Sequence, residues 1–190
     1  MIADKGIRKL NTGISGLDLI TYGGLPEGRT TLVSGSAGSG KTILAAQFLT
    51  EGIRGSDEAG VFVTFEESPE DIRQNIASLG WTVRQWEAED KWRFVDVSPH
   101  VEDEALIVGD YDLGALLARI EYAVNSIGAT RVSLDSLSAV FSRFEDHTVI
   151  RSELLRIATA LKRMGVTAVI TAERDTEYGE ITNHKMQEFV

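Results

Sequence analysis

The chain has 190 residues, of which 43% are hydrophobic and 25% are charged, and its formal net charge at pH 7 is -10. This length and composition favour one folded domain with a sizeable core and exclude intrinsic disorder. The sequence has no cysteine, which excludes disulfide bonds and thiolate metal sites, and its three histidines lack metal-ligand spacing. Because neither a signal peptide nor a long apolar segment is evident, we expect a cytoplasmic protein without a membrane span.

The net charge also disfavours nucleic-acid binding, because a binder needs a broad basic surface to neutralise phosphates. Acidity is concentrated between residues 87 and 112, where nine acidic residues occur with only two Lys or Arg residues. We interpret this acidic stretch as a solvated connection, and the alternative is a docking surface for a basic partner.

Short apolar runs alternate with helical patterns along the chain, and the first half carries two such pairs. A strand predicted over residues 31–34 leads through a glycine-rich turn into a helix over 42–53. A second strand over 61–65 precedes the sequence SPED at 68–71, which supplies a helix cap, a first-turn proline and two acids. We therefore expect a second helix to begin at this point.

The second half of the chain repeats the alternation, and each of its two long helical patterns is closed by a glycine, Gly128 or Gly165. Strands are predicted at 93–97, 131–135 and 166–171, and helices at 112–127 and 149–164. This order predicts one α/β domain over residues 1–190, with a mostly parallel twisted sheet flanked by helices.

The strongest motif follows the first strand, where GSAGSGKT at 35–42 matches G-x-x-x-x-G-K-T at every fixed position. Its glycines allow successive N–H groups to point inward and cradle phosphate oxygens at a helix N-terminus. Lys41 would place a positive charge between the β- and γ-phosphates, and the Thr42 hydroxyl would ligate Mg²⁺. The motif predicts an ATP site with magnesium.

A phosphate loop requires an acidic residue at the end of another core strand to hold the magnesium, usually through water. Asp135 meets this requirement. Glu66 and Glu67 directly follow the predicted strand at 61–65, so they would lie on the same edge of a parallel sheet, where one carboxylate can activate the attacking water. If the strand stays regular, alternation sends their side chains to opposite faces, and one of them should dominate.

Five segments carry a resemblance to a known family: TGISGLD at 12–18, GGLPEGR at 23–29, LVSG at 32–35, GVFVTFEESP at 60–69 and SLGW at 78–81. The first is shared with archaeal recombinases of the RadA type. The combination of GVFVTFEESP with SLGW is far more specific, and with it the whole chain resembles the KaiC family of RecA-like P-loop ATPases.

The resemblance implies a hexameric ring that binds ATP between neighbouring subunits, hydrolyses it slowly and acts as a regulatory or clock ATPase through protein partners. It implies that Glu66 is the general base, that Glu67 supports it, and that Ser78 is a further nucleotide contact. With the phosphate loop, the expected nucleotide-binding residues are Gly35, Ser36, Ala37, Gly38, Ser39, Gly40, Lys41, Thr42, Ile43 and Ser78.

Family members of the clock type carry a second such domain, and Ser/Thr autokinase activity is expected only there. The family fold should also continue through further strands after Val190, so we expect the C-terminal strands of the domain to be missing from these 190 residues.

Two other functions fit the same fold. In a RadA-type recombinase or accessory ATPase, the loops at 136–148 and 173–185 would face DNA, but both carry more acidic than Lys or Arg residues. In an ATP-dependent protein scaffold without useful turnover, bound nucleotide would only order a docking surface.

Overall fold

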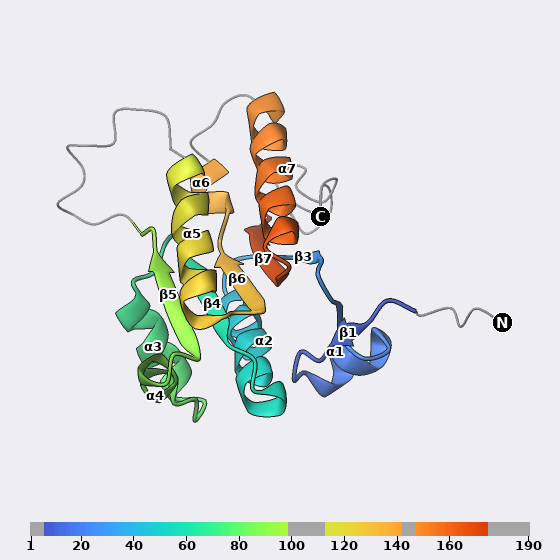
Figure 1. Ribbon diagram of the computed structural model, residues 1–190, viewed down its shortest axis with the longest axis vertical. Helices are drawn as coiled ribbons and strands as arrows, with labels where there is room; N and C mark the ends of the chain where they lie inside the picture. The colour runs from blue at the N-terminus through green and yellow to red at the C-terminus, as the bar shows by residue number, and fades with distance from the viewer. Residues whose placement is uncertain (1–5, 99–112, 142–146, 175–190) are drawn as a thin grey trace.

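The structure is a computed structural model that describes residues 6–98, 113–141 and 147–174 (Figure 1). Much of the acidic stretch, at residues 99–112, lies outside the described residues. So do residues 142–146 and 175–190, which include parts of the two loops that a recombinase would turn toward DNA.

Five parallel strands form the central sheet in the order β3-β7-β6-β4-β5. These strands are β3 (Thr30–Gly35), β4 (Gly60–Thr64), β5 (Trp92–Asp96), β6 (Arg131–Asp135) and β7 (Thr167–Glu173). All five were predicted, and their ends differ from the predicted ends by two residues at most. Every residue of β4 and β6 is buried, as expected for inner strands of a parallel sheet that is covered on both faces.

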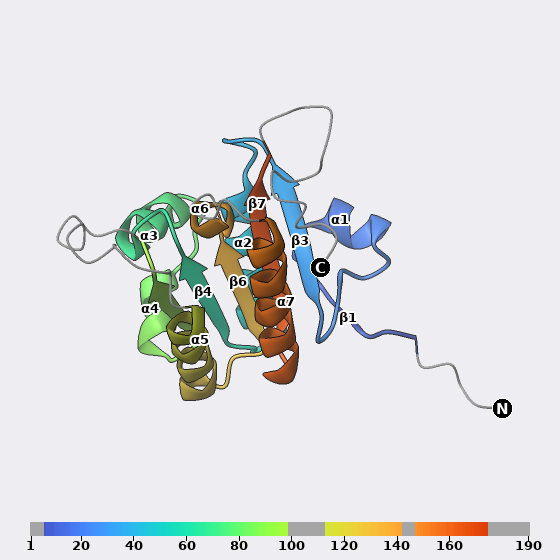
Figure 2. The same ribbon diagram turned by 90° about the horizontal axis from the view of Figure 1, so that it is seen from above.

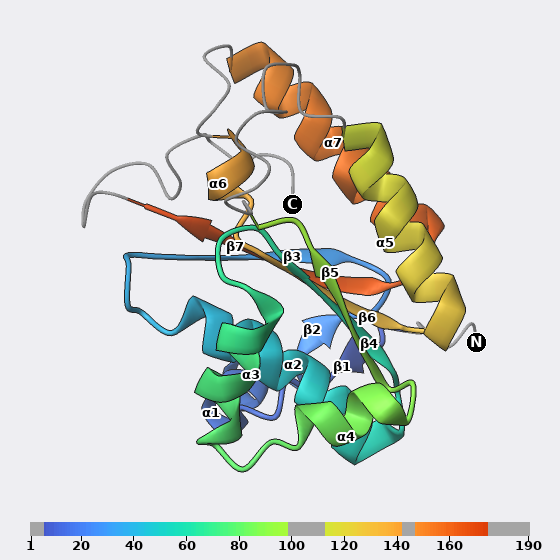
Figure 3. The ribbon, with the colours of Figure 1, turned by 90° about the vertical axis from the view of Figure 1, so that its left-hand side faces the viewer.

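Helices cover both faces of this sheet (Figure 3). Their bounds are α1 (Ser15–Ile20), α2 (Lys41–Ser56), α3 (Pro69–Ala77), α4 (Val83–Ala88), α5 (Leu113–Ile127), α6 (Ser138–Phe141) and α7 (His147–Arg163). In Figure 3, α2, α3 and α4 lie on one side of the sheet, and α5 and α7 lie on the other. Two buried clusters of apolar side chains fill the two interfaces. Within the described ranges, no helix is long and apolar enough to cross a membrane.

The four predicted helices are confirmed as α2, α3, α5 and α7. Ser68 caps α3 as expected, since its side chain accepts a hydrogen bond from the Asp71 N–H at 3.2 Å. Gly128 and Gly165 follow α5 and α7 with positive φ values of 63° and 74°, as expected for glycines that end helices.

Several short elements were not predicted from the sequence. They are α1, α4, α6 and a two-stranded antiparallel sheet formed by β1 (Lys9–Leu10) and β2 (Leu25–Pro26). Elements of two to six residues are too short for a periodic apolar pattern, and α1 buries no residue at all. Tertiary contacts therefore decide their conformation.

Candidate active site at the carboxyl edge of the sheet

The carboxyl ends of the central strands open on one edge of the sheet. Figure 2 shows the arrowheads of β3, β7, β6 and β4 pointing to this edge. The phosphate loop follows β3, the pair Glu66 and Glu67 follows β4, and Asp135 ends β6. The structure thus brings together three of the sequence-predicted parts of the site, at the place where open parallel sheets bind ligands.

The phosphate loop runs from the end of β3 into the first turn of α2. Gly38 and Gly40 have φ values of 74° and 85°, a left-handed conformation that residues with a side chain rarely adopt. The Lys41 ammonium donates to the Ser36 carbonyl at 2.9 Å, so the lysine is held over its own loop. Because the first N–H groups of α2 have no intrahelical acceptor, this end of the helix can bind a phosphate.

The helix behind the loop is anchored to the sheet. Its buried face includes Ala45, Ala46, Phe48 and Leu49. The buried Ser133 hydroxyl of β6 donates to the Ala45 carbonyl at 2.8 Å. This bond joins the helix that follows the phosphate loop to the strand that carries Asp135, so the two parts of the site have one rigid support.

Asp135 is the last residue of β6, and only 9% of it is exposed. The Asp135 carboxylate accepts a hydrogen bond from the Thr171 hydroxyl of β7, and the Asp135 carbonyl accepts one from the Phe65 N–H at 3.0 Å. Mg²⁺ prefers oxygen ligands and keeps several waters, so one carboxylate and one hydroxyl from the protein suit it. The carboxylate of Asp135 and the hydroxyl of Thr42 therefore fit the magnesium role.

The two glutamates lie in the turn between β4, which ends at Thr64, one residue before its predicted end, and α3, which begins at Pro69. The expectation that strand alternation separates their side chains therefore does not apply to them. Glu66 accepts a hydrogen bond from the Ser136 hydroxyl at 3.1 Å, and Glu67 accepts one from the Asn75 amide at 3.1 Å.

Glu66, Glu67 and Asp135 form what we call the acidic rim. The pKa of Glu67 is raised above its ordinary value, first because partial burial penalises the charged carboxylate and then because Asp135 repels it. The hydrogen bond from Asn75 acts in the opposite direction, and the charges of Asp71 and Glu66 raise the pKa further. Glu67 is therefore electrostatically coupled to the predicted magnesium ligand.

Two further predicted nucleotide contacts lie in α2 and at the C-terminal end of α3. Ile43 is in the first turn of α2 and is 37% exposed. Ser78 is the C-terminal cap of α3, and its hydroxyl donates to the Asn75 carbonyl at 2.7 Å. The observed partner of Ser78 is thus the end of its own helix, and its contact with a nucleotide stays a prediction.

Three residues of the site were missed from the sequence: Ser136, Thr171 and Asn75. Ser136 directly follows Asp135, so its position could have drawn attention to it. Thr171 lies 36 residues after Asp135, and Asn75 lies eight residues after Glu67. No local pattern connects these pairs, because the sheet and α3 bring them together.

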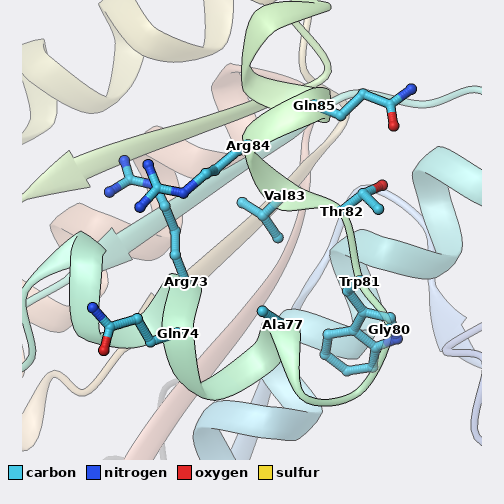
Figure 4. Close-up of a pocket in the computed structure, with 9 residues that line it drawn as sticks. All are labelled: Arg73, Gln74, Ala77, Gly80, Trp81, Thr82, Val83, Arg84 and Gln85. Carbon is cyan, nitrogen blue, oxygen red and sulfur yellow. The ribbon is translucent and has the colours of Figure 1, made fainter.

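A separate pocket of about 510 Å³ lies between α3 and α4 (Figure 4). The side chains of Arg73 and Arg84 converge at one end of it, and Trp81 lies at the other. Both guanidinium groups form ion pairs with Glu70, at 3.3 and 2.6 Å, and Arg73 also pairs with Glu87. The charges at this end are thus already compensated by protein carboxylates.

The parallel sheet, the helices on both faces and the phosphate loop at its carboxyl edge define a RecA-like α/β domain with a P-loop. The sequence pattern of the KaiC ATPase family matches residues 10–190. The chain therefore belongs to the KaiC ATPase family, and this result favours the KaiC assignment over the RadA-type alternative.

The chain is similar to several clock proteins. It is 56% identical to the circadian clock protein KaiC3 of Synechocystis sp. over 97% of its length, and 50% identical to the circadian clock oscillator protein KaiC of Rippkaea orientalis over 98%. It is 46% identical to KaiC of Prochlorococcus marinus over 97%. The chain spans about 36% of the length of the first two relatives and 37% of the third.

Proposed function

We propose that this chain is an ATP-binding, slowly hydrolysing domain that acts as a nucleotide-dependent regulatory or clock ATPase. The observation that carries this proposal is the position of the phosphate loop and the acidic rim on one edge of the sheet. An ATPase needs both, because one part binds the phosphates and the other holds magnesium and orients the attacking water.

Each part of the site has its own task in this mechanism. The N–H groups of the loop and the Lys41 ammonium bind the β- and γ-phosphates, and Thr42 and Asp135 would hold the metal. Bound Mg²⁺ would neutralise charge on the transferred phosphoryl group. Glu66 would accept a proton from the attacking water, and Ser136 holds one oxygen of its carboxylate. Glu67 would support Glu66 from the adjacent position.

The assembly and its setting are part of the proposal. By its family, the chain would form a homo-hexamer with ATP at the subunit interfaces and would signal to regulatory protein partners in the cytoplasm, without nucleic acid or membrane. Autokinase activity would belong to a second domain of a longer protein.

The proposal is tested by measuring ATP hydrolysis together with sedimentation, with and without ATP and Mg²⁺, on this chain and on a longer polypeptide that contains it. We expect slow, magnesium-dependent phosphate release and ATP-dependent assembly in the longer polypeptide. ATP binding without any turnover in an assembled ring would contradict the hydrolytic function and favour the scaffold. Salt-sensitive binding to single-stranded DNA would contradict the exclusion of nucleic acid.

A further inference from the structure

The turn that carries Glu67 is held from two sides. The hydroxyl of Thr64, a buried residue at the end of β4, donates to the backbone carbonyl of Glu67 at 2.5 Å. The side-chain amide of Asn75 in α3 donates to the Glu67 Oε2 atom at 3.1 Å. The first bond fixes the backbone of the turn, and the second fixes the direction of the carboxylate.

The helix that presents Asn75 is well anchored. Two of its own residues, Ile72 and Ile76, are fully buried, and Ser68 caps its first turn. Asn75 lies two positions from both Arg73 and Ala77, which line the pocket between α3 and α4. Since a helix turns about 100° per residue, Asn75 lies roughly 200° around the helix from these two residues, and its amide reaches Glu67.

A bond between an exposed amide and a glutamate is common, and the same helix offers a second example. Gln74 donates to Glu70 at 3.2 Å, but Glu70 also pairs with Arg73 and Arg84. Glu67 has a different environment, because the charges of Asp135 and Glu66 act on it. Repulsion from these carboxylates would favour other rotamers of Glu67, and the amide of Asn75 opposes that change.

We propose that Asn75 is a positioning residue for ATP hydrolysis, which holds the carboxylate of Glu67 in the acidic rim through its side-chain amide. The inference rests on the proposed ATPase function and adds a role for α3 in turnover. Asn75 need not touch ATP, because it acts through Glu67.

The first test compares Asn75→Ala with Gln74→Ala in the full-length protein. Both amides belong to α3, and each variant removes one hydrogen bond from an amide to a glutamate. Only Asn75→Ala removes a bond to a glutamate of the acidic rim. We expect Asn75→Ala to lower kcat about tenfold, within the range of losses that follow displacement of a catalytic group. The affinity for ATP should stay unchanged, and Gln74→Ala should hydrolyse ATP like the wild type.

A donor at the same place should restore activity. In Asn75→His, the Nδ1 atom is bonded to Cγ as the amide nitrogen of asparagine is, so the ring can donate to Glu67 from a similar position. We expect kcat to recover in this variant. If Asn75→Ala acts only by destabilising α3, its unfolding midpoint should fall in parallel with kcat, and that result would overturn the proposal.

The decisive measurement repeats Asn75→Ala in a Glu67→Gln background. If Asn75 acts through the Glu67 carboxylate, adding Asn75→Ala to Glu67→Gln should lower kcat little further. If the two residues act independently, their fold losses in kcat should multiply. The same fold loss in both backgrounds would overturn the role of Asn75. A wild-type protein without ATP turnover would instead overturn the proposed function itself, together with this inference.

Discussion

The phosphate loop is closed by contacts between near neighbours in the sequence, whereas the acidic rim is assembled across long distances in the chain. Lys41 reaches the Ser36 carbonyl over five positions. In the rim, Ser136 reaches Glu66 over 70 positions, and Thr171 reaches Asp135 over 36. The loop can therefore be identified from eight consecutive residues, but the geometry of the rim exists only after the sheet has formed.

This difference suggests a division of tasks between the two regions. In the proposed mechanism, the loop presents N–H groups and one lysine to the phosphates, so changes there should mainly affect ATP binding. In the same mechanism, the carboxylates of the rim act on the attacking water and the metal, so changes there should mainly affect turnover.

The largest effect is expected for Glu66→Gln. Loss of a general base commonly lowers the rate about 10²- to 10⁴-fold, and the amide keeps the size of the side chain while removing a negative charge near the phosphates. The variant should therefore lose most turnover and still bind ATP. Single-turnover hydrolysis with a parallel binding titration measures both quantities. Near-normal hydrolysis would remove Glu66 from the mechanism.

Lys41→Ala should act on binding. Truncating one partner of a buried, hydrogen-bonded charge pair costs about 2–5 kcal/mol, so we expect the ATP affinity to fall about 30-fold or more. The matched control is Lys91→Ala, because Lys91 pairs with Asp57 away from the site. Calorimetry with ATP and Mg²⁺ distinguishes the two variants, and unchanged affinity in Lys41→Ala would contradict the phosphate-loop assignment.

Glu67→Gln should lower turnover less than Glu66→Gln, on the order of tenfold, because the proposed mechanism gives Glu67 a supporting role and the proton to Glu66. Its ATP affinity should stay near that of the wild type. Measuring kcat for both variants shows which of the two glutamates contributes more to turnover. A larger loss in Glu67→Gln would exchange the roles of the two glutamates.

The smallest effect is expected for Ser133→Ala, at the hydrogen bond that joins β6 of the acidic rim to the helix behind the phosphate loop. Ser133→Ala removes the buried bond to the Ala45 carbonyl, which should lower the free energy of unfolding by about 1 kcal/mol and the Tm by roughly 2–4 °C. Ser152→Ala is the matched control, because its hydroxyl donates to the Val149 carbonyl at 2.8 Å on the exposed side of α7. Equal thermal shifts in the two variants would show that the buried bond has no special role.

Much of the fold could be predicted because its strands and long helices have periodic patterns of their own. The strand over 131–135 was predicted with the observed ends. Ser68 was predicted as the cap of a helix that begins there, and it caps α3. The end of β4 was predicted one residue too late. Strand pairing with β5 and β6 stops at Thr64, and the Thr64 hydroxyl then bonds to the turn, which no period in the sequence reveals.

Arg131 shows the same limit in the core. Its sequence position indicates only the start of a strand, yet it is 1% exposed. Its guanidinium pairs with Glu58 at 2.7 Å and donates to the carbonyls of Asn11 and Phe48 at 2.8 and 2.9 Å. A buried charge needs such partners, and here they come from three segments that are distant in the sequence.

The phosphate loop, the succession of strands and helices along the chain, and the acids that end or follow two of the strands could be predicted, because each depends on residues close together in the chain. The tertiary structure alone decided which groups hold those acids. Ser136 bonds to Glu66, Asn75 bonds to Glu67 and Thr171 bonds to Asp135. Asn75 meets Glu67 because α3 folds back on the turn that follows β4. The other two pairs meet because packing, and not sequence, orders the parallel strands: β6 pairs with β4, and β7 lies between β3 and β6 and places Thr171 beside Asp135.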